Sequence, residues 1–202
     1  MKSFLLAIMI ISTICSCNNT STVPNPPVQQ PPVDTAHQQP AKQSFFPVTE
    51  YLKGELFQFR QDGITPIKYT TIKEHTDSFW VKEQQLNKEV REFLDPVIDS
   101  ANLTPFFTEK QFMDRTLDAI TFSYDPTGVL PDSIKINRWD VYVDPKTGKV
   151  KRVYMVKSKG DKTLQLTWLS GKYCKINTII NKPDGSFELE KEEKIVWVPD
   201  TE

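Results

Sequence analysis

The residues best suited to acid–base chemistry lie at positions 73–78, in the segment Lys-Glu-His-Thr-Asp-Ser. An imidazole titrates near neutral pH and a neighbouring carboxylate can fix its tautomer, so His75 with Glu74 or Asp77 is the strongest catalytic candidate. Successive side chains of a strand point to opposite faces, however, and Asp77 or Ser78 is better used as the N-cap of a helix. We therefore expect a solvated or capping histidine, no catalytic residue and no enzymatic activity.

The sequence also lacks the motifs that are typical of other reaction classes. The sequence contains no Gly-rich phosphate loop, HExxH, GxSxG or CxxC. Two histidines and three cysteines leave few ligands for zinc, and the interleaved Glu and Lys of residues 188–194 are typical of a solvated strand face rather than a calcium site. The net charge of -1, without clustered cations, disfavours binding to phosphates. We expect no metal, no cofactor and no nucleic-acid partner.

Cysteine gives the clearest indication of location. The apolar run from Phe4 to Ile11 is far shorter than the roughly 20 residues that span a bilayer, and it follows Lys2 as in a signal peptide. Next comes Ile14-Cys15-Ser16-Cys17, which resembles the lipobox of bacterial lipoproteins. That motif has an aliphatic residue three positions before the lipidated cysteine and a small residue directly before it. Cys17 fits the motif, whereas Cys15 follows the bulky Ile14.

The lipobox resemblance implies that residues 1–16 are removed as a lipoprotein signal peptide and that Cys17 carries fatty acyl chains such as palmitate. Two or more chains make a stable membrane anchor. Asn18 after the lipidated cysteine, with no acidic cluster, implies an outer-membrane lipoprotein that faces the periplasm. The alternative is a simple secretory peptide cleaved nearby, which leaves Cys17 as a free thiol. The whole chain also resembles envelope lipoproteins of Bacteroidetes-type bacteria, a label that implies no activity.

Residues 17–44 comprise this cysteine and a Pro/Gln-rich stretch. From Asn18 to Ser44 the chain holds six of its 15 prolines and no glycine. It has too few apolar side chains to offset its ordering entropy by burial. We expect a disordered tether of polyproline II character. It either reaches toward peptidoglycan or a partner, or only holds the domain clear of the lipid surface.

Residues 45–202 are expected to form a single α+β domain. Val48, Leu52, Leu56 and Phe59 recur at helical spacing, and a second helix is expected from Asp77 or Ser78 to Pro96. Thr108 to Gln111 resembles a capping box that starts a short turn. The expected strands are 66–74, 120–124, 134–143, 150–157, 162–169, 172–180 and a last strand, or split strand, that runs through 195–198. Short loops require antiparallel neighbours, so the pattern predicts N-terminal helices packed on a curved antiparallel β-sheet meander.

The order of these elements is similar to that of the NTF2-like fold, and a cystatin-like geometry is the alternative. Periplasmic lipoprotein carriers of the LolA and LolB type also combine an antiparallel sheet with helices at its mouth. These resemblances imply a curved sheet that can enclose a cavity.

The aromatic residues allow two interpretations. Trp80, Phe122, Trp139 and Trp168 could line a ligand pocket, or they could form the core that a sheet and its helices normally share. Cys174 is the only thiol outside the first 17 residues. It shares a strand face with Ile176 and Thr178, which favours a buried, inert thiol.

These observations favour a non-catalytic, lipid-anchored binding or assembly module of the cell envelope. Its expected partners are the membrane, through the N-terminal lipid, and an envelope protein. One alternative is a carrier or sensor of an apolar ligand in the sheet cavity. A periplasmic hydrolase without a recognisable motif is the third hypothesis.

Overall fold

The computed structural model describes residues 45–197 of the 202-residue chain. The predicted signal peptide, the lipid attachment at Cys17 and the tether lie outside the described residues. The helices are α1 Val48–Gln61, α2 Glu83–Glu89, α3 Arg91–Leu94 and α4 Ser100–Leu103. The strands are β1 Ile67–Ile72, β2 His75–Trp80, β3 Phe107–Asp114, β4 Ala119–Pro126, β5 Ile136–Val143, β6 Val150–Lys159, β7 Lys162–Leu169, β8 Tyr173–Asn181 and β9 Phe187–Val196. None of the described helices is long and apolar enough to cross a membrane.

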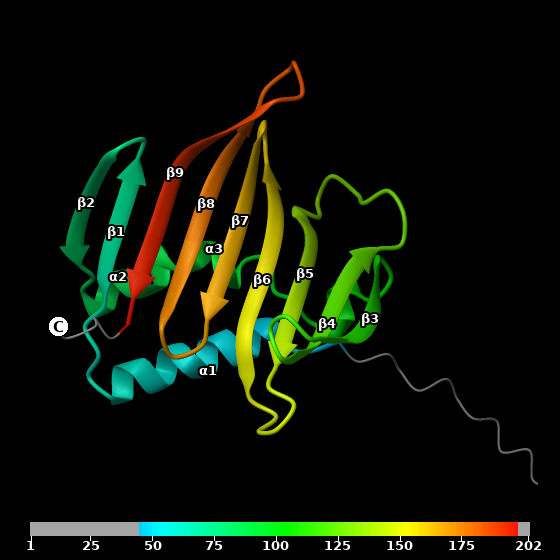
Figure 1. The fold of residues 1–202 in the computed structure, drawn as a ribbon, viewed down its shortest axis with the longest axis horizontal. Helices are drawn as coiled ribbons and strands as arrows, with labels where there is room; N and C mark the ends of the chain where they lie inside the picture. Colours follow the sequence, from blue (N-terminus) through cyan, green and yellow to red (C-terminus); the bar gives the residue numbers. More distant parts are fainter. Residues whose placement is uncertain (1–44, 198–202) are drawn as a thin grey trace, which may run out of the picture. The chain divides into compact units, whose positions relative to one another are not determined.

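The nine strands of the described region form one antiparallel sheet in the order β2-β1-β9-β8-β7-β6-β5-β4-β3 (Figure 1). From β3 to β9 each strand pairs with the next strand of the sequence. The first strand, β1, pairs with the last, β9, so that the β1–β2 hairpin extends the meander at its far end. The predicted antiparallel sheet and α+β class are thereby confirmed, with β2 and β3 as the two edges.

Glycines with a left-handed backbone make the tight turns of the meander. Gly148 ends the β5–β6 loop with φ 69°, and Gly171 lies between β7 and β8 with φ 70°. A residue with a Cβ atom is strained in this region. In the first of these loops the Asp144 carboxylate also accepts hydrogen bonds from the backbone N–H groups of Lys146 and Thr147, at 2.9 and 2.8 Å. Both loops are short connections between antiparallel neighbours, as the spacing of the predicted strands requires.

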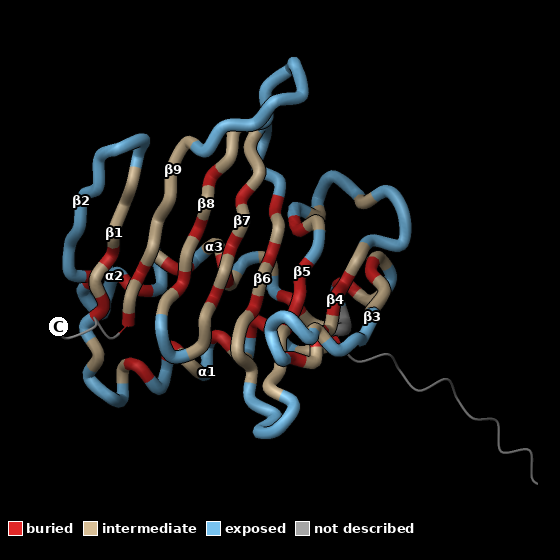
Figure 2. Tube along the Cα trace, in the orientation of Figure 1, coloured by how far each residue is buried: buried red, intermediate tan, exposed pale blue. Residues whose placement is uncertain are grey.

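The core lies between α1 and one face of the sheet. Val48, Leu52 and Leu56 line one side of α1 and are at most 2% exposed, as their helical spacing requires. Buried and half-buried residues alternate along β6, β7 and β8, because only one face of these strands is covered (Figure 2). The largest side chains of this layer are Trp139, Trp168 and Trp197. Burial of one large apolar side chain contributes about 1.5–3 kcal/mol, so the layer holds the helix on the sheet.

The predicted helix from Asp77 or Ser78 to Pro96 is wrong in its first half. Both residues lie in β2, which pairs with β1 along its whole length. The turn before β2 contains Lys73 at φ 54°, a backbone conformation usually taken by glycine, so the sequence carried no turn residue to mark the hairpin. Helix structure begins only at Glu83 and is divided between α2 and α3.

The predicted capping box at Thr108–Gln111 is also wrong. These residues belong to β3, where Thr108 pairs with Asp125 and Gln111 with Phe122 of β4. Asp114 closes this hairpin by accepting the backbone N–H of Thr116 at 2.9 Å. Thr108 and Gln111 are three residues apart in a strand, so their side chains lie on opposite faces of the sheet and do not form a capping box.

Candidate binding surface

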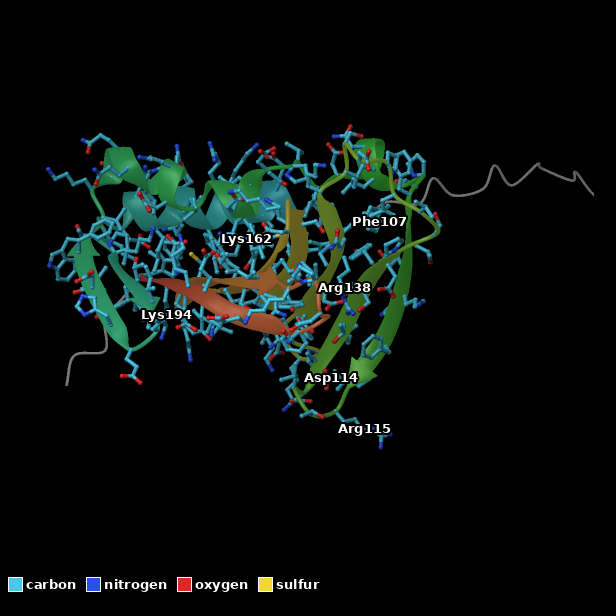
Figure 3. The ribbon with its side chains drawn as sticks, turned by 90° about the horizontal axis from the view of Figure 1, so that it is seen from above. Phe107, Asp114, Arg115, Arg138, Lys162 and Lys194 are labelled. Atoms are coloured by element: carbon cyan, nitrogen blue, oxygen red, sulfur yellow. The ribbon has the colours of Figure 1, made fainter. Side chains whose placement is uncertain are left out.

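The two faces of the sheet have different surroundings. The helices all lie on one side, as Figure 3 shows, and Lys162 projects into the space between them and the sheet. Lys194 lies on the side turned away from the helices. Along β6, β7 and β8 the residues that alternate with the buried ones point to that side, and in β4 and β5 the buried Thr121, Ser123 and Asp140 share it. No described helix covers this second face, which we call the open face.

The strand register arranges the residues of the open face into rows that cross the sheet, because directly paired residues share a face. The first row is Phe112, Thr121, Tyr142, Arg152, Leu169, Tyr173, Val196, Ile67 and Trp80. The second row, beside it, is Lys110, Ser123, Asp140, Tyr154, Thr167, Lys175, Lys194, Tyr69 and Ser78. We call these two rows the aromatic stripe, since aromatic rings recur in them from one edge of the sheet to the other.

Two cations of the stripe stack on its tyrosines. The Arg152 guanidinium carbon lies 3.9 Å from the centre of the Tyr142 ring, and the Lys194 ammonium lies 4.6 Å from the centre of the Tyr173 ring. Neither cation forms an ion pair with a carboxylate among residues 45–197. The charged members of the stripe are Lys110, Arg152, Lys175 and Lys194 against Asp140 alone. Lys110 and Lys175 are paired with Asp125 and Glu192, at 3.1 Å each, so Arg152 and Lys194 are the cations of the stripe without an ion-pair partner among the described residues.

A buried polar cluster supports one end of the stripe. The Asp140 carboxylate, in a residue only 3% exposed, accepts hydrogen bonds from Ser123, from Arg138 at 3.1 and 3.2 Å and from the Tyr142 hydroxyl at 3.5 Å. Burial favours the neutral form of Arg138, but the charge of Asp140 outweighs it and raises the pKa of that guanidinium. Burial, followed by the charge of Asp140, raises the pKa of the Tyr142 hydroxyl. The cluster thus holds Tyr142 in place as a neutral ring.

The Ser123 hydroxyl of this cluster is not placed against a histidine base of the described region. Ser123 donates to a carboxylate that Arg138 already binds, and no histidine contacts its hydroxyl among the described residues. His75 lies in the edge strand β2, where its side chain is 80% exposed and its Nε2 atom lies 3.1 Å from Asp77 Oδ1. The other histidine, His37, lies outside the described residues. Residues 45–197 also contain no group of three His, Cys, Asp or Glu side chains that could hold a metal ion.

The four aromatic residues named from the sequence are not brought together. Trp139 and Trp168 are fully buried in the core, where Trp139 stacks on Tyr124 with ring centres 4.6 Å apart. Phe122 is half-buried and packs against the same core. Trp80, by contrast, is 57% exposed and ends the first row of the stripe. Only Trp80 of the four is therefore available on the open face.

Cys174 occupies the buried position expected for it. It is 2% exposed on the helix side of β8, and its thiol has no disulfide partner among the described residues. Burial raises the pKa of this thiol above its usual value, although a backbone hydrogen bond from Ile195 opposes the shift. The inertness of the thiol stays a prediction. Cys17, the expected lipid attachment site, lies outside the described residues.

Two hollows on the helix side of the sheet have charged walls. They measure about 290 and 220 Å³, lie beside α3 and share Glu92 and Lys159 in their linings. The Lys157 ammonium reaches Glu92 at 2.8 Å, and Lys162 reaches Glu190 at 2.6 Å. Most of the lysines and carboxylates that face these hollows are thus paired with one another, while Lys135 and Asp95 form no ion pair among the described residues. Such walls offer little to an apolar ligand.

Sequence reasoning named Trp80 but missed the remainder of the stripe. The only signal was the recurrence of Tyr, Lys and Thr at positions that alternate with apolar ones, as in Tyr173-Cys174-Lys175. That pattern identifies an outward face, but it does not give the register that aligns the strands. No family model, curated protein or solved structure matches this chain. The site therefore rests on its own geometry.

Proposed function

We propose that the protein is a lipid-anchored, non-catalytic binding or assembly module of the cell envelope, and that its binding surface is the aromatic stripe. The observation that carries the proposal is the exposure of aromatic rings and unpaired cations together on a sheet face without a helical cover. Trp80 and Phe112, near opposite edges, are 57% and 49% exposed. Tyr, Trp, Phe and Arg are enriched in binding interfaces because they offer large, rigid contact areas.

The anchor part of the proposal rests on the lipobox at residues 14–17. Acylation of Cys17 would hold the domain at the outer membrane on the periplasmic side, and the tether would give the domain reach. The proposal also includes an NTF2-like or cystatin-like geometry for the domain, supported by a helix that lies across one face of a twisted antiparallel sheet.

The anchor is tested by comparing Cys17 with Cys15, two positions earlier in the sequence. Cells that express the full chain are fed labelled palmitate, and wild type, Cys17→Ser and Cys15→Ser are followed by envelope fractionation and intact-mass measurement. Label and outer-membrane location should be lost in Cys17→Ser and kept in Cys15→Ser. Label retained by Cys17→Ser, or an unmodified wild-type mass, would contradict the anchor.

The binding surface is tested with two exposed aromatic positions of similar accessibility. A photo-crosslinking amino acid replaces either Trp80, 57% exposed on the open face, or Phe57, 60% exposed on α1. Irradiation of intact cells should give a discrete adduct from position 80 and none from position 57. The absence of an adduct at 80, or the same adducts from both positions, would remove the stripe as the binding surface.

A further inference from the structure

The stripe has the dimensions of a linear ligand. It crosses the sheet from β2 to β3, and strands lie about 4.8 Å apart, so its length is roughly 38 Å. Its two rows are only about 7 Å wide, since alternate residues of a strand share a face. A ligand that follows it is an extended polymer rather than a compact small molecule.

The chemistry of the stripe differs from that of a peptide-binding edge. The backbone groups of the inner strands are already paired with their neighbours, so a polymer that crosses the open face contacts side chains only. Tyr173 and Tyr69 are half-buried aromatic residues of the open face, with the Lys194 ammonium 4.6 Å from the centre of the Tyr173 ring, while Ser78 and Thr167 of the second row add hydroxyl groups. A sugar ring has an apolar C–H face and hydroxyl groups around its edge, which match this combination.

The charge of the stripe indicates which kind of sugar polymer fits. Arg152 and Lys194 have no carboxylate partner among the described residues, and they lie three strands apart, roughly 14 Å. The only carboxylate of the stripe, Asp140, is buried and already bound by Arg138. A ligand with carboxylates spaced along its length would neutralise both free cations. A neutral chain would leave them unpaired.

We propose that the aromatic stripe binds a linear acidic polysaccharide, with sugar rings on Tyr173 and Tyr69 and sugar carboxylates at Arg152 and Lys194. This inference rests on the proposed binding function and names the chemical class of the ligand.

The test uses the purified lipidated chain in micelles of a neutral detergent. Galacturonate oligomers are titrated against it, with their neutral methyl esters, glutamate oligomers of equal charge and oligothymidylate as comparison ligands. Tryptophan fluorescence reports binding, because Trp80 is the exposed tryptophan while Trp139, Trp168 and Trp197 are at most 1% exposed. The galacturonate oligomers should bind most tightly, and their affinity should fall with added salt.

Two substitutions separate the roles of charge and ring. Lys194→Gln and Tyr173→Leu should each weaken galacturonate binding about five- to tenfold. Lys53→Gln, on an α1 side chain that is 51% exposed, removes a cation from the other side and should leave the affinity within about twofold. Circular dichroism melting establishes that the variants are folded. Full affinity in Lys194→Gln would overturn the proposal even if Tyr173→Leu failed to fold.

The comparison ligands decide between ligand classes. Equal or tighter binding of glutamate oligomers would replace the polysaccharide with an acidic peptide, and equal binding of oligothymidylate would replace it with a nucleic acid. Absence of galacturonate binding refutes the ligand class. If the adduct from position 80 nevertheless forms in cells, the binding function stands, and if both are absent, both proposals fail.

Discussion

Lys157 and Lys159 bind the same carboxylate in very different surroundings. The Lys157 side chain is 7% exposed, and its ammonium donates to Glu92 Oε2 at 2.8 Å and to the backbone carbonyls of Glu92 and Asp95 at 2.9 and 2.5 Å. The Lys159 side chain is 62% exposed and reaches Glu92 Oε1 at 2.9 Å. The two lysines therefore allow a buried ion pair and an exposed one to be compared on the same carboxylate.

The structure predicts a large difference between the two lysines. Lys157→Met keeps the aliphatic stem but leaves two carbonyls and one carboxylate oxygen without their donor. Breaking a buried pair in this way costs about 3–5 kcal/mol. The lower end, about 3 kcal/mol, applies because the Glu92 side chain is 25% exposed and keeps Lys159. Lys159→Met removes an exposed pair, which is worth about 0.5 kcal/mol.

Urea unfolding followed by circular dichroism measures both effects. With a slope of about 2 kcal/mol/M, Lys157→Met should lower the midpoint by about 1.5 M and Lys159→Met by about 0.3 M. Equal shifts in the two variants would refute the argument that burial decides the strength of the contact. A loss below about 1 kcal/mol for Lys157→Met would show that this ammonium does not hold α3 on the sheet.

Three other properties can be measured on the same protein. Burial raises the pKa of Glu92, but hydrogen bonds from Lys157 and Lys159 outweigh it and keep the value below normal. The ionised Glu92 carboxylate therefore stabilises the fold fully above its unfolded pKa of about 4.3, and this stabilisation is lost as the pH falls through the lower folded pKa. Acid should consequently lower the urea midpoint less in Glu92→Gln than in wild type. Cys174 should stay unreactive toward Ellman's reagent until urea unfolds the domain, and rapid reaction of native protein would contradict its burial. In denaturant titrations Trp168→Ala should lower the free energy of unfolding by about 3–5 kcal/mol, and Trp80→Ala by less than about 1 kcal/mol. Similar losses in the two variants would contradict the burial of Trp168 and the exposure of Trp80.

The meander could be predicted because its determinants are local. Apolar and polar residues alternate along β7 and most of β8, and Gly148 and Gly171 mark where the chain turns back. The hairpin of β1 and β2 escaped prediction because its turn contains Lys73 at positive φ, while Asp77 and Ser78 matched the caps of a helix that does not form. The pairing of β2 with β1 thus overrode the helix-capping preference of these two residue types.

The candidate surface could be predicted only in part. Trp80 was named because large aromatic residues are conspicuous in any sequence, but Tyr69 and Lys194 gain their significance from facing one another across β1 and β9. These strands come from opposite ends of the described chain, and no turn motif records their register. A one-residue shift of the pairing would move Tyr69 to the helix side and divide the stripe.

The β1–β9 junction shows how the core and the open face depend on each other. Lys68 precedes Tyr69 in β1 and points to the helix side, where its ammonium lies 2.6 Å from Glu89 of α2 and 2.7 Å from Glu193 of β9. Burial lowers the pKa of Lys68, but the hydrogen bonds to these carboxylates raise it above its usual value, so the lysine remains charged. The contacts join β1, β9 and α2 on one face. Because neighbouring side chains alternate, the same contacts fix Tyr69 beside Lys194 on the other face, and the position of the exposed stripe is set by ion pairs beneath it.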